Sequence, residues 1–539
     1  MPMIKVQSFG GIAPVIPARF LKDTMAQTAV NCEVFNGSLK SLPDVGPTVH
    51  TLAKTGLTKT IYRYGQDLIS DTEYWFHWLT DVDVCRGQIA GDTSEWTFYT
   101  GDGPPKATHA AIATAGNNHP AAYRRLGIPN PDSSCVAIAN GTPDPSDTPE
   151  TRVYTYTWVA KEAGYDMESG PAPASIPVDC TADQTVTISG FQPTPSSGYN
   201  ITHKRIYRSV GGLFLFLAEI SAATDSYIDD SDPAALGEIL PSLYWNQPPD
   251  DLAGLTNMPN GMMAGFVSRD VYFCAPYQPH AWPQSYVQTV DYPVVGLGRM
   301  DTTLAVLTTG VPYLMQGSSP DSVAVVKSDL EQACVAKNSI VSFGSSVLYA
   351  APDGLMMLSS GGSRIITEKL FDYRLWQSFF KPESIHAYAH DNKYIAFYDN
   401  DGTRGGFIFD VASGEFTLHD MWCECGFQDM QRDKLFLGYS DRTLKVWQDG
   451  DNQDYTWKSK KFTMPQIMGF SCAQLESEAY PMVVKVIADD TVIHTQTVQS
   501  RNPFRLPAVV GRDWELQIEG SEEVFSLAMA TSMTELASV

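Results

Sequence analysis

Val347-Leu348-Tyr349-Ala350-Ala351-Pro352 runs straight into Asp353-Gly354-Leu355-Met356-Met357-Leu358. Two apolar, strand-forming runs on either side of a Pro-Asp-Gly turn predict a β-hairpin. Strands that end at a turn, most with a hairpin partner, recur at residues 271–276, 394–398 with 406–410, and 434–439 with 443–447. Paired strands that recur roughly every 40 to 50 residues are typical of a β-propeller. We therefore expect residues 246–452 to belong to a propeller-like body, in which the repeats are too divergent for the number of blades to be counted.

Earlier in the chain, residues 46–145 carry the same kind of pattern. Aromatic strands are predicted at residues 60–64, 74–78 and 96–100, with turn signals at Gly91-Asp92 and Gly101-Asp102-Gly103-Pro104. Short strands joined by such turns favour a sandwich, a barrel or a propeller. We assign this segment to the first part of the same body, so the fold class is expected to be mostly β.

A different pattern separates the two parts of the body. Residues 140–151 are turn-formers with almost no apolar content, and residues 153–158 then alternate strictly between two faces. Further strands follow at residues 185–188 and 203–208. The segment resembles a fibronectin type III or immunoglobulin-like sandwich of about 100 residues. We predict an autonomous sandwich at residues 146–245, inserted into the body.

The two ends of the chain are assigned separately. Residues 1–45 are expected to form an extended arm that either contacts another subunit or adds as a strand, with one short helix at residues 20–34. Residues 453–539 are expected to form a C-terminal β sandwich. Apolar residues at helical spacing also predict one amphipathic helix at residues 368–380.

The charge of the chain limits its partners. Sixty-one acidic against 37 basic residues give a formal charge of −24 and a pI near 4.7. Proteins that grip nucleic acid present Lys and Arg to the phosphates, so this composition opposes tight DNA binding. Two explanations stay open: solubility alone, or a surface past which DNA slides without sticking.

Metal and cofactor sites are not expected. The cysteines are odd in number and scattered, at positions Cys32, Cys85, Cys135, Cys180, Cys274, Cys334, Cys423, Cys425 and Cys472. This predicts buried thiols rather than a disulfide framework. Cys423 and Cys425 form a C-x-C pair without a second Cys/His pair nearby, which disfavours zinc. Asp229, Asp230 and Asp232 could in principle hold calcium, but the segment lacks the glycine and final Glu of an EF-hand.

No catalytic residues are predicted either. The sequence contains no G-x-S-x-G elbow, phosphate loop, H-E-x-x-H or dinucleotide fingerprint, and Val295-Gly296-Leu297-Gly298 is a lone G-x-G. Paired carboxylates of a propeller glycosidase are separated in space rather than in sequence, so this alternative stays open. His280 and Trp282 could serve as a base and a sugar platform. The flanking Pro279 and Pro283 favour instead a structural aromatic corner.

Several strings resemble virion proteins of short-tailed bacteriophages. They are Phe9-Gly10-Gly11-Ile12-Ala13-Pro14, Ala29-Val30-Asn31-Cys32, Asn36-Gly37-Ser38-Leu39-Lys40, Trp78-Leu79-Thr80-Asp81-Val82-Asp83-Val84, Phe98-Tyr99-Thr100-Gly101-Asp102-Gly103-Pro104-Pro105, Leu126-Gly127-Ile128-Pro129, Ala275-Pro276-Tyr277-Gln278-Pro279-His280-Ala281-Trp282-Pro283 and Ala351-Pro352-Asp353-Gly354-Leu355. They span most of residues 1–360, and nothing after residue 450 matches. Within this group, the chain resembles the tail nozzle (tail tubular protein B) family.

This resemblance implies a non-enzymatic structural component of the phage tail. It implies a homohexameric ring below the portal and adaptor, next to tail fibre or spike proteins, through which genomic DNA passes without specific binding. The sequence does not show which acids would face such a lumen. The alternative is a receptor- or glycan-binding tail component, an adhesin, which would be a trimer.

The expected location follows from the same resemblance. No apolar run approaches the roughly 20 residues needed to cross a bilayer, and the N-terminus lacks the pattern of a secretory signal. We expect the protein to fold in the bacterial host cytoplasm and to be carried in the virion tail.

Overall fold

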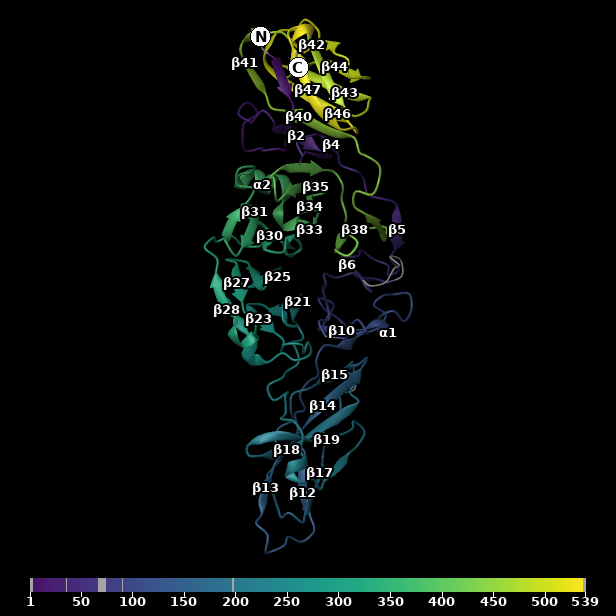
Figure 1. Ribbon diagram of the computed structural model, residues 1–539, viewed down its shortest axis with the longest axis vertical. Helices are drawn as coiled ribbons and strands as arrows, with labels where there is room; N and C mark the ends of the chain where they lie inside the picture. The colour runs from purple at the N-terminus through teal and green to yellow at the C-terminus, as the bar shows by residue number, and fades with distance from the viewer. Residues whose placement is uncertain (1–2, 35, 66–73, 90, 196–197, 537–539) are drawn as a thin grey trace. The chain divides into compact units, whose positions relative to one another are not determined.

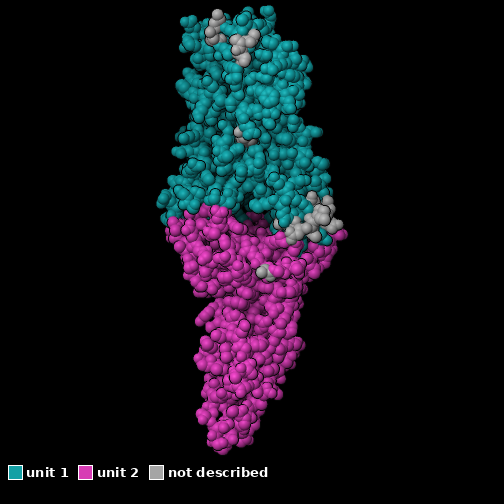
Figure 2. Space-filling view, viewed as in Figure 1, with its two compact units in different colours: residues 1–75, 305–313, 327–539 teal, residues 76–304, 314–326 magenta. Residues whose placement is uncertain are grey.

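The computed structural model describes all residues except 1–2, 35, 66–73, 90, 196–197 and 537–539 (Figure 1). Strands make up 46% of the protein and helices 6%, so the prediction of a mostly β fold is confirmed. The chain divides into two compact units (Figure 2). Unit 1 contains residues 1–75, 305–313 and 327–539, and unit 2 contains residues 76–304 and 314–326. Among the described residues, no helix has the length and apolar character needed to cross a membrane.

Unit 1 contains antiparallel sheets whose strands pair largely in chain order. One is formed by β29 (Val341–Ser342), β30 (Ser346–Ala351), β31 (Gly354–Ser359) and β32 (Gly362–Ile365), and another by β37 (Cys425–Asp429), β38 (Lys434–Gly438) and β39 (Thr443–Val446) with β5 (Thr48–Thr51). A third meander, β33 (His386–His390), β34 (Lys393–Asn400), β35 (Thr403–Asp410) and β36 (Phe416–His419), is part of a larger sheet. Four-stranded meanders of this kind are the blades of propellers. The body is therefore propeller-like in its repeated element.

The hairpin that opens the first of these patterns forms as predicted. Ala351 of β30 pairs with Gly354 of β31, which leaves Pro352 and Asp353 as the turn. A Cβ atom on Gly354 would lie 2.5 Å from the Thr367 hydroxyl, so only glycine fits there. The apolar side chains of both strands are buried, as the two apolar runs predicted, except Met357, which is partly buried.

The N-terminal residues are built into unit 1. Among them are β1 (Met3–Val6), β2 (Ala26–Val30), β3 (Cys32–Glu33), β4 (Lys40–Ser41) and β6 (Thr60–Arg63). β1 pairs with β47 (Val524–Ala530), and buried Phe9 packs edge-on against Trp457 at 4.9 Å. Of the two possibilities for the arm, strand addition is the one observed. The helix predicted at residues 20–34 is wrong, because β2 pairs with β40 (Tyr455–Ser459) there and this tertiary pairing overrides local propensity.

The C-terminal strands complete unit 1. They are β40, β41 (Phe462–Met468), β42 (Cys472–Ser477), β43 (Met482–Ala488), β44 (Thr491–Val498), β45 (Phe504–Arg505), β46 (Gly511–Gly520) and β47, followed by α3 (Met533–Leu536). One sheet runs from β33 through β36, β2, β40 and β46 to β44. The predicted boundary between residues 452 and 453 therefore falls inside unit 1. The amphipathic helix is observed as α2 (Tyr373–Phe380), shorter than predicted because Asp372 caps it by accepting the Leu375 N–H at 2.8 Å.

Unit 2 contains two sheets of the blade type and the sandwich. The sheets are β8 (Asp83–Arg86), β9 (Thr97–Thr100), β10 (Lys106–Thr108) and β11 (Arg124–Arg125), and β21 (Ala253–Asn257), β22 (Met263–Val267), β23 (Asp270–Phe273) and β24 (Gln288–Thr289). The short helix α1 (Ala110–Ala113) follows β10. Elsewhere the chain forms β7 (Trp75–Trp78), β25 (Val294–Met300), β26 (Thr303–Thr308), β27 (Tyr313–Gln316) and β28 (Ala324–Lys327).

The sandwich has two main sheets around one core. One is β12 (Val136–Asn140), β17 (Thr185–Ser189) and β20 (Ser226–Asp229); the other is β15 (Tyr165–Glu168), β14 (Tyr154–Glu162), β18 (His203–Val210) and β19 (Leu213–Ser221). A small sheet pairs β13 (Glu150–Arg152) with β16 (Val178–Cys180). Inward side chains of β14 and β17 share a buried cluster.

One boundary of the sandwich needs correction. The sandwich was predicted to begin at residue 146, after the turn-rich stretch 140–151. In the structure β12 lies before that stretch and pairs along its whole length with β17. The stretch is therefore a loop within the sandwich, between β12 and β13, rather than a linker in front of it. Composition identified the loop but not the strand that precedes it.

Candidate functional site

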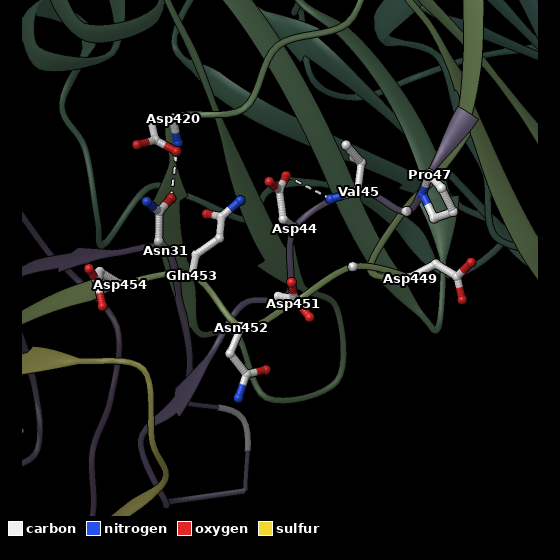
Figure 3. A pocket seen from close by; sticks show the side chains of 12 residues that line it. Asn31, Asp44, Val45, Pro47, Asp420, Asp449, Asp451, Asn452, Gln453 and Asp454 are labelled. Carbon is white, nitrogen blue, oxygen red and sulfur yellow. Dashed lines mark hydrogen bonds between the residues drawn. The ribbon is translucent and has the colours of Figure 1, made fainter. Parts of the chain in front are cut away.

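An acidic hollow lies in unit 1 (Figure 3). Two segments far apart in the sequence, residues 44–47 and 449–454, run side by side, and Asn31 and Asp420 complete the lining. The hollow measures about 810 Å³. Its lining contains five exposed aspartates and no Lys, Arg or His: Asp44, Asp420, Asp449, Asp451 and Asp454.

Backbone hydrogen bonds hold the two segments together. The Asp44 N–H donates to the Asp451 carbonyl at 2.8 Å, and the Gly450 N–H donates to the Asp44 carbonyl at 2.9 Å. A Cβ atom on Gly450 would lie 2.5 Å from the Val45 carbonyl oxygen, so glycine permits this close approach. The positions of the aspartates are therefore fixed by main-chain pairing rather than by their own side chains.

Few of these carboxylates accept a hydrogen bond from the protein. Asp44 accepts its neighbour's N–H, from Val45, at 2.7 Å, and Asn31 accepts the Asp420 N–H at 3.1 Å. Within the described residues, no group of three or more His, Cys, Asp or Glu side chains is arranged to hold a metal ion. The hollow is thus a concentration of solvated negative charge, which repels other anions within roughly a Debye length.

A second hollow, of about 350 Å³, shares Asn452 with the first. It adds Glu33, Glu478, Glu522 and Glu523 to the acidic surface. Lys40 is the cation of its lining and pairs with Glu523 at 3.3 Å. The negative surface of unit 1 therefore extends beyond the first hollow.

The carboxylates of the sandwich in unit 2 behave differently. Arg205 donates to Glu168 at 2.7 Å, to Asp166 at 2.8 Å and to Glu219 at 2.9 Å. Lys161 also donates to Glu219, at 2.6 Å. Here the acids are neutralised by cations and serve the packing of strands.

Glu162, at the end of β14, is another neutralised acid. It accepts two hydrogen bonds from Arg124, each 2.8 Å long, and one from Asn200 at 2.9 Å. Burial raises the pKa of Glu162, but the hydrogen bonds from Arg124 and Asn200 outweigh it and lower the pKa to about 2. Glu162 thereby ties the sandwich to β11.

His280 and Trp282 lie buried in the turn between β23 and β24. The Trp282 indole N–H donates to the Pro279 carbonyl at 2.9 Å, so it belongs to the turn rather than to a sugar platform. The His280 ring contacts the Tyr165 hydroxyl at 2.7 Å and accepts the Glu168 N–H at 3.2 Å. Burial lowers the pKa of His280 to about 3. This geometry fits the interpretation of residues 279–283 as a structural aromatic corner.

The three aspartates considered for calcium do not converge. Asp229 is fully buried, accepts the Tyr154 hydroxyl at 2.7 Å and pairs with Arg208 at 3.1 Å. Asp232 instead accepts the Ala234 N–H at the start of a 3-10 turn, η1 (Pro233–Ala235). Asp229 is thus part of an ion pair within the sandwich.

Cys423 and Cys425 are both buried. Burial raises the pKa of the Cys425 thiol to about 12 and raises that of Cys423 as well. Cys423 lies 3.6 Å from the His386 ring, whose pKa burial lowers to about 4. Both partners are neutral near pH 7, so the pair has neither a thiolate nor an imidazolium. The G-x-G at residues 295–298 lies within strand β25 and not at a helix start.

Sequence reasoning missed the acidic hollow. The run Asp449-Gly450-Asp451-Asn452-Gln453-Asp454 is its one visible signal. Nothing local shows that Asp44 and Asp420 join it.

Comparisons with known proteins add little. No protein-family model and no curated protein matches the chain. Among solved structures, BamB from Moraxella catarrhalis aligns with a TM-score of 0.29 and 9% identity, over 70% of this chain and 85% of that one. Hsv2 from Kluyvelomyces marxianus aligns with a TM-score of 0.25 and 10% identity, over 59% of this chain and 95% of that one. Similarities this weak support no argument about fold or function.

Proposed function

We propose that the chain is a non-enzymatic structural protein of a short-tailed phage tail, and that six copies form a nozzle ring around the path of the DNA. The observation that carries the proposal is the acidic hollow, with five exposed aspartates and no cation in its lining. The strings quoted above, which resemble tail nozzle proteins, support the same assignment. The ring would sit below the portal and adaptor, next to fibre or spike proteins.

The charge suits a conduit. Six copies of a chain with charge −24 carry −144 formal charges before counterions. A negative wall repels phosphate, whereas a basic wall would bind DNA through counterion release and slow its passage. A surface such as the acidic hollow is what a low-friction lumen requires.

Stoichiometry is the first test. The mass of the intact recombinant assembly, measured under native conditions, should equal six copies, and a virion reconstruction should show six copies around the tail axis. Three copies at the tail periphery would contradict the nozzle and favour an adhesin.

Binding and activity are the second test. Double-stranded DNA should show negligible affinity at physiological salt, and the purified protein should cleave neither polysaccharide nor peptidoglycan. Strong DNA binding would contradict a conduit, and robust polysaccharide cleavage would favour the glycosidase alternative.

A further inference from the structure

The contact between His280 and the sandwich joins two parts of unit 2. His280 lies in the turn between β23 and β24, and its ring reaches the Tyr165 hydroxyl and the Glu168 N–H, both of β15. His280 is 2% exposed and Tyr165 is 9% exposed. The contact therefore connects a blade-type sheet to the sandwich in a dry environment.

The geometry requires a neutral imidazole. Nε2 accepts the Glu168 N–H at 3.2 Å, so that nitrogen carries no proton. The single ring proton is then on Nδ1, 2.7 Å from the Tyr165 oxygen. A second proton on Nε2 would point at the Glu168 N–H and would abolish this hydrogen bond.

The charged groups near this contact already form hydrogen bonds or ion pairs with other residues. On β15, the Glu168 carboxylate accepts from Arg205, Tyr207 and Thr157, and the Asp166 carboxylate pairs with Arg205. Trp245 packs edge-on against the His280 ring at 5.2 Å and carries no charge. Cys274, at the end of β23, is a buried neutral thiol. An imidazolium at position 280 would therefore be a buried cation without its own counter-ion.

We propose that the His280 contact is a pH-sensitive catch, which holds the sandwich against the β21–β24 sheet at neutral pH and opens more often as the pH falls. The inference is independent of the nozzle assignment, because it depends only on the neighbours of His280.

Proton linkage sets the size of the effect. Burial lowers the pKa of His280 from its ordinary 6.5 to about 3, so the open form takes up the proton first as the pH falls below 6.5. The closed contact is thus stabilised above pH 6.5 and weakens as the pH falls toward 3. Between about pH 7 and about pH 5.5 the opening equilibrium should rise about eightfold.

Hydrogen exchange of the Glu168 amide on the full chain measures this opening directly, because that amide donates to His280. After correction for intrinsic exchange, the rate should rise about eightfold between about pH 7 and about pH 5.5. His280→Gln keeps a carbonyl oxygen to accept the amide and does not titrate, so its rate should stay flat. A wild-type rate that does not rise, or an equal rise in H280Q, would overturn the proposal.

Two further variants serve as controls for this experiment. His386→Gln changes another buried histidine, in unit 1, and should leave the rise at Glu168 intact. If H280Q fails to fold, Tyr165→Phe keeps the bond to Nε2 and should open more at each pH with the same eightfold rise. Loss of the rise in H386Q or in Y165F would also contradict the catch.

Discussion

The acids of the unit 1 hollow and those of the unit 2 sandwich that pair with arginines have opposite surroundings. In the unit 1 hollow, five exposed aspartates are held by main-chain pairing, and no cation lines the hollow. In the unit 2 sandwich, Arg205 alone engages three carboxylates, and Asp229 is buried against Arg208. The contrast lies in how these acids are paired and not in total charge, because unit 2 carries 26 acidic against 11 basic residues and unit 1 carries 35 against 26. Paired acids hold strands together, whereas the unpaired ones contribute little to stability and are available for a task outside the chain.

The largest effect should come from breaking the buried pair. Asp229→Ala removes the carboxylate between Arg208 and the Tyr154 hydroxyl and leaves the buried guanidinium with only the half-exposed Glu150 carboxylate, 3.8 Å away. We expect a loss of about 3–5 kcal/mol in the free energy of unfolding, measured in urea. Asp230→Ala, at the exposed neighbouring position, should change stability by less than about 0.5 kcal/mol. Equal effects of the two variants would show that the pair does not hold the sandwich.

A smaller effect is expected at the partly exposed network. Arg205→Met removes three charge-assisted hydrogen bonds and leaves the buried Glu168 carboxylate with hydroxyl donors alone. The cost should be about 1–3 kcal/mol in urea unfolding. Arg404→Met, which breaks an exposed pair with Asp399 in unit 1, should cost less than about 1 kcal/mol. A cost for R404M as large as that for R205M would remove the contrast between the units.

A pH series separates paired from unpaired acids. The pKa of Glu162 is lowered from 4.5 to about 2, so its contribution to stability is complete above pH 4.5 and is lost as the pH falls toward 2. Glu162→Gln should be less stable than the wild type at neutral pH, and the difference should narrow in acid. Asp454→Asn in the hollow should change the free energy of unfolding by less than about 0.5 kcal/mol at neutral pH. A pH-independent difference for E162Q would contradict the ion pair with Arg124.

The smallest effect on stability is expected in the hollow itself. Replacing Asp449, Asp451 and Asp454 together by Lys should alter the free energy of unfolding by less than about 0.5 kcal/mol per position. The same variant should bind duplex DNA at low salt, with an affinity that falls linearly with log salt, as fluorescence anisotropy can measure. The matched triple Asn variant should bind far more weakly. If the Lys variant does not bind DNA, the charge of the hollow does not determine whether the protein repels DNA.

Local patterns predicted the short-range elements of the fold. The hairpin at residues 347–358 needed only two apolar runs and a turn, and both its strands and its turn were correct. Local patterns could not predict pairings between distant segments: β5 completes a sheet with β39, and β12 pairs with β17 although β13 to β16 lie between them in the chain. Strand partners are chosen by packing across the whole core, which no window of sequence contains.

The candidate site shows the same limit. The acidic run at residues 449–454 is visible in the sequence. The negative charge of the hollow also depends on Asp44 and Asp420, which the fold places beside this run, and on a lining without cations. The pairing of Glu168 and Asp229 with arginines was equally hidden, since each ion pair joins different strands. Asp229 was considered for calcium because a list of acids does not show which are already neutralised.

The pairing of β1 with β47 has a consequence for synthesis on the ribosome. More than 500 residues separate Met3 from its partner Ala530. At roughly 5–20 residues per second, the first strand waits tens of seconds to minutes for its partner. All of unit 2 has been translated well before that, since it is formed by residues 76–304 and 314–326. The nascent chain should therefore fold from its middle outward, and unit 1 should close last around β1, β2 and β5.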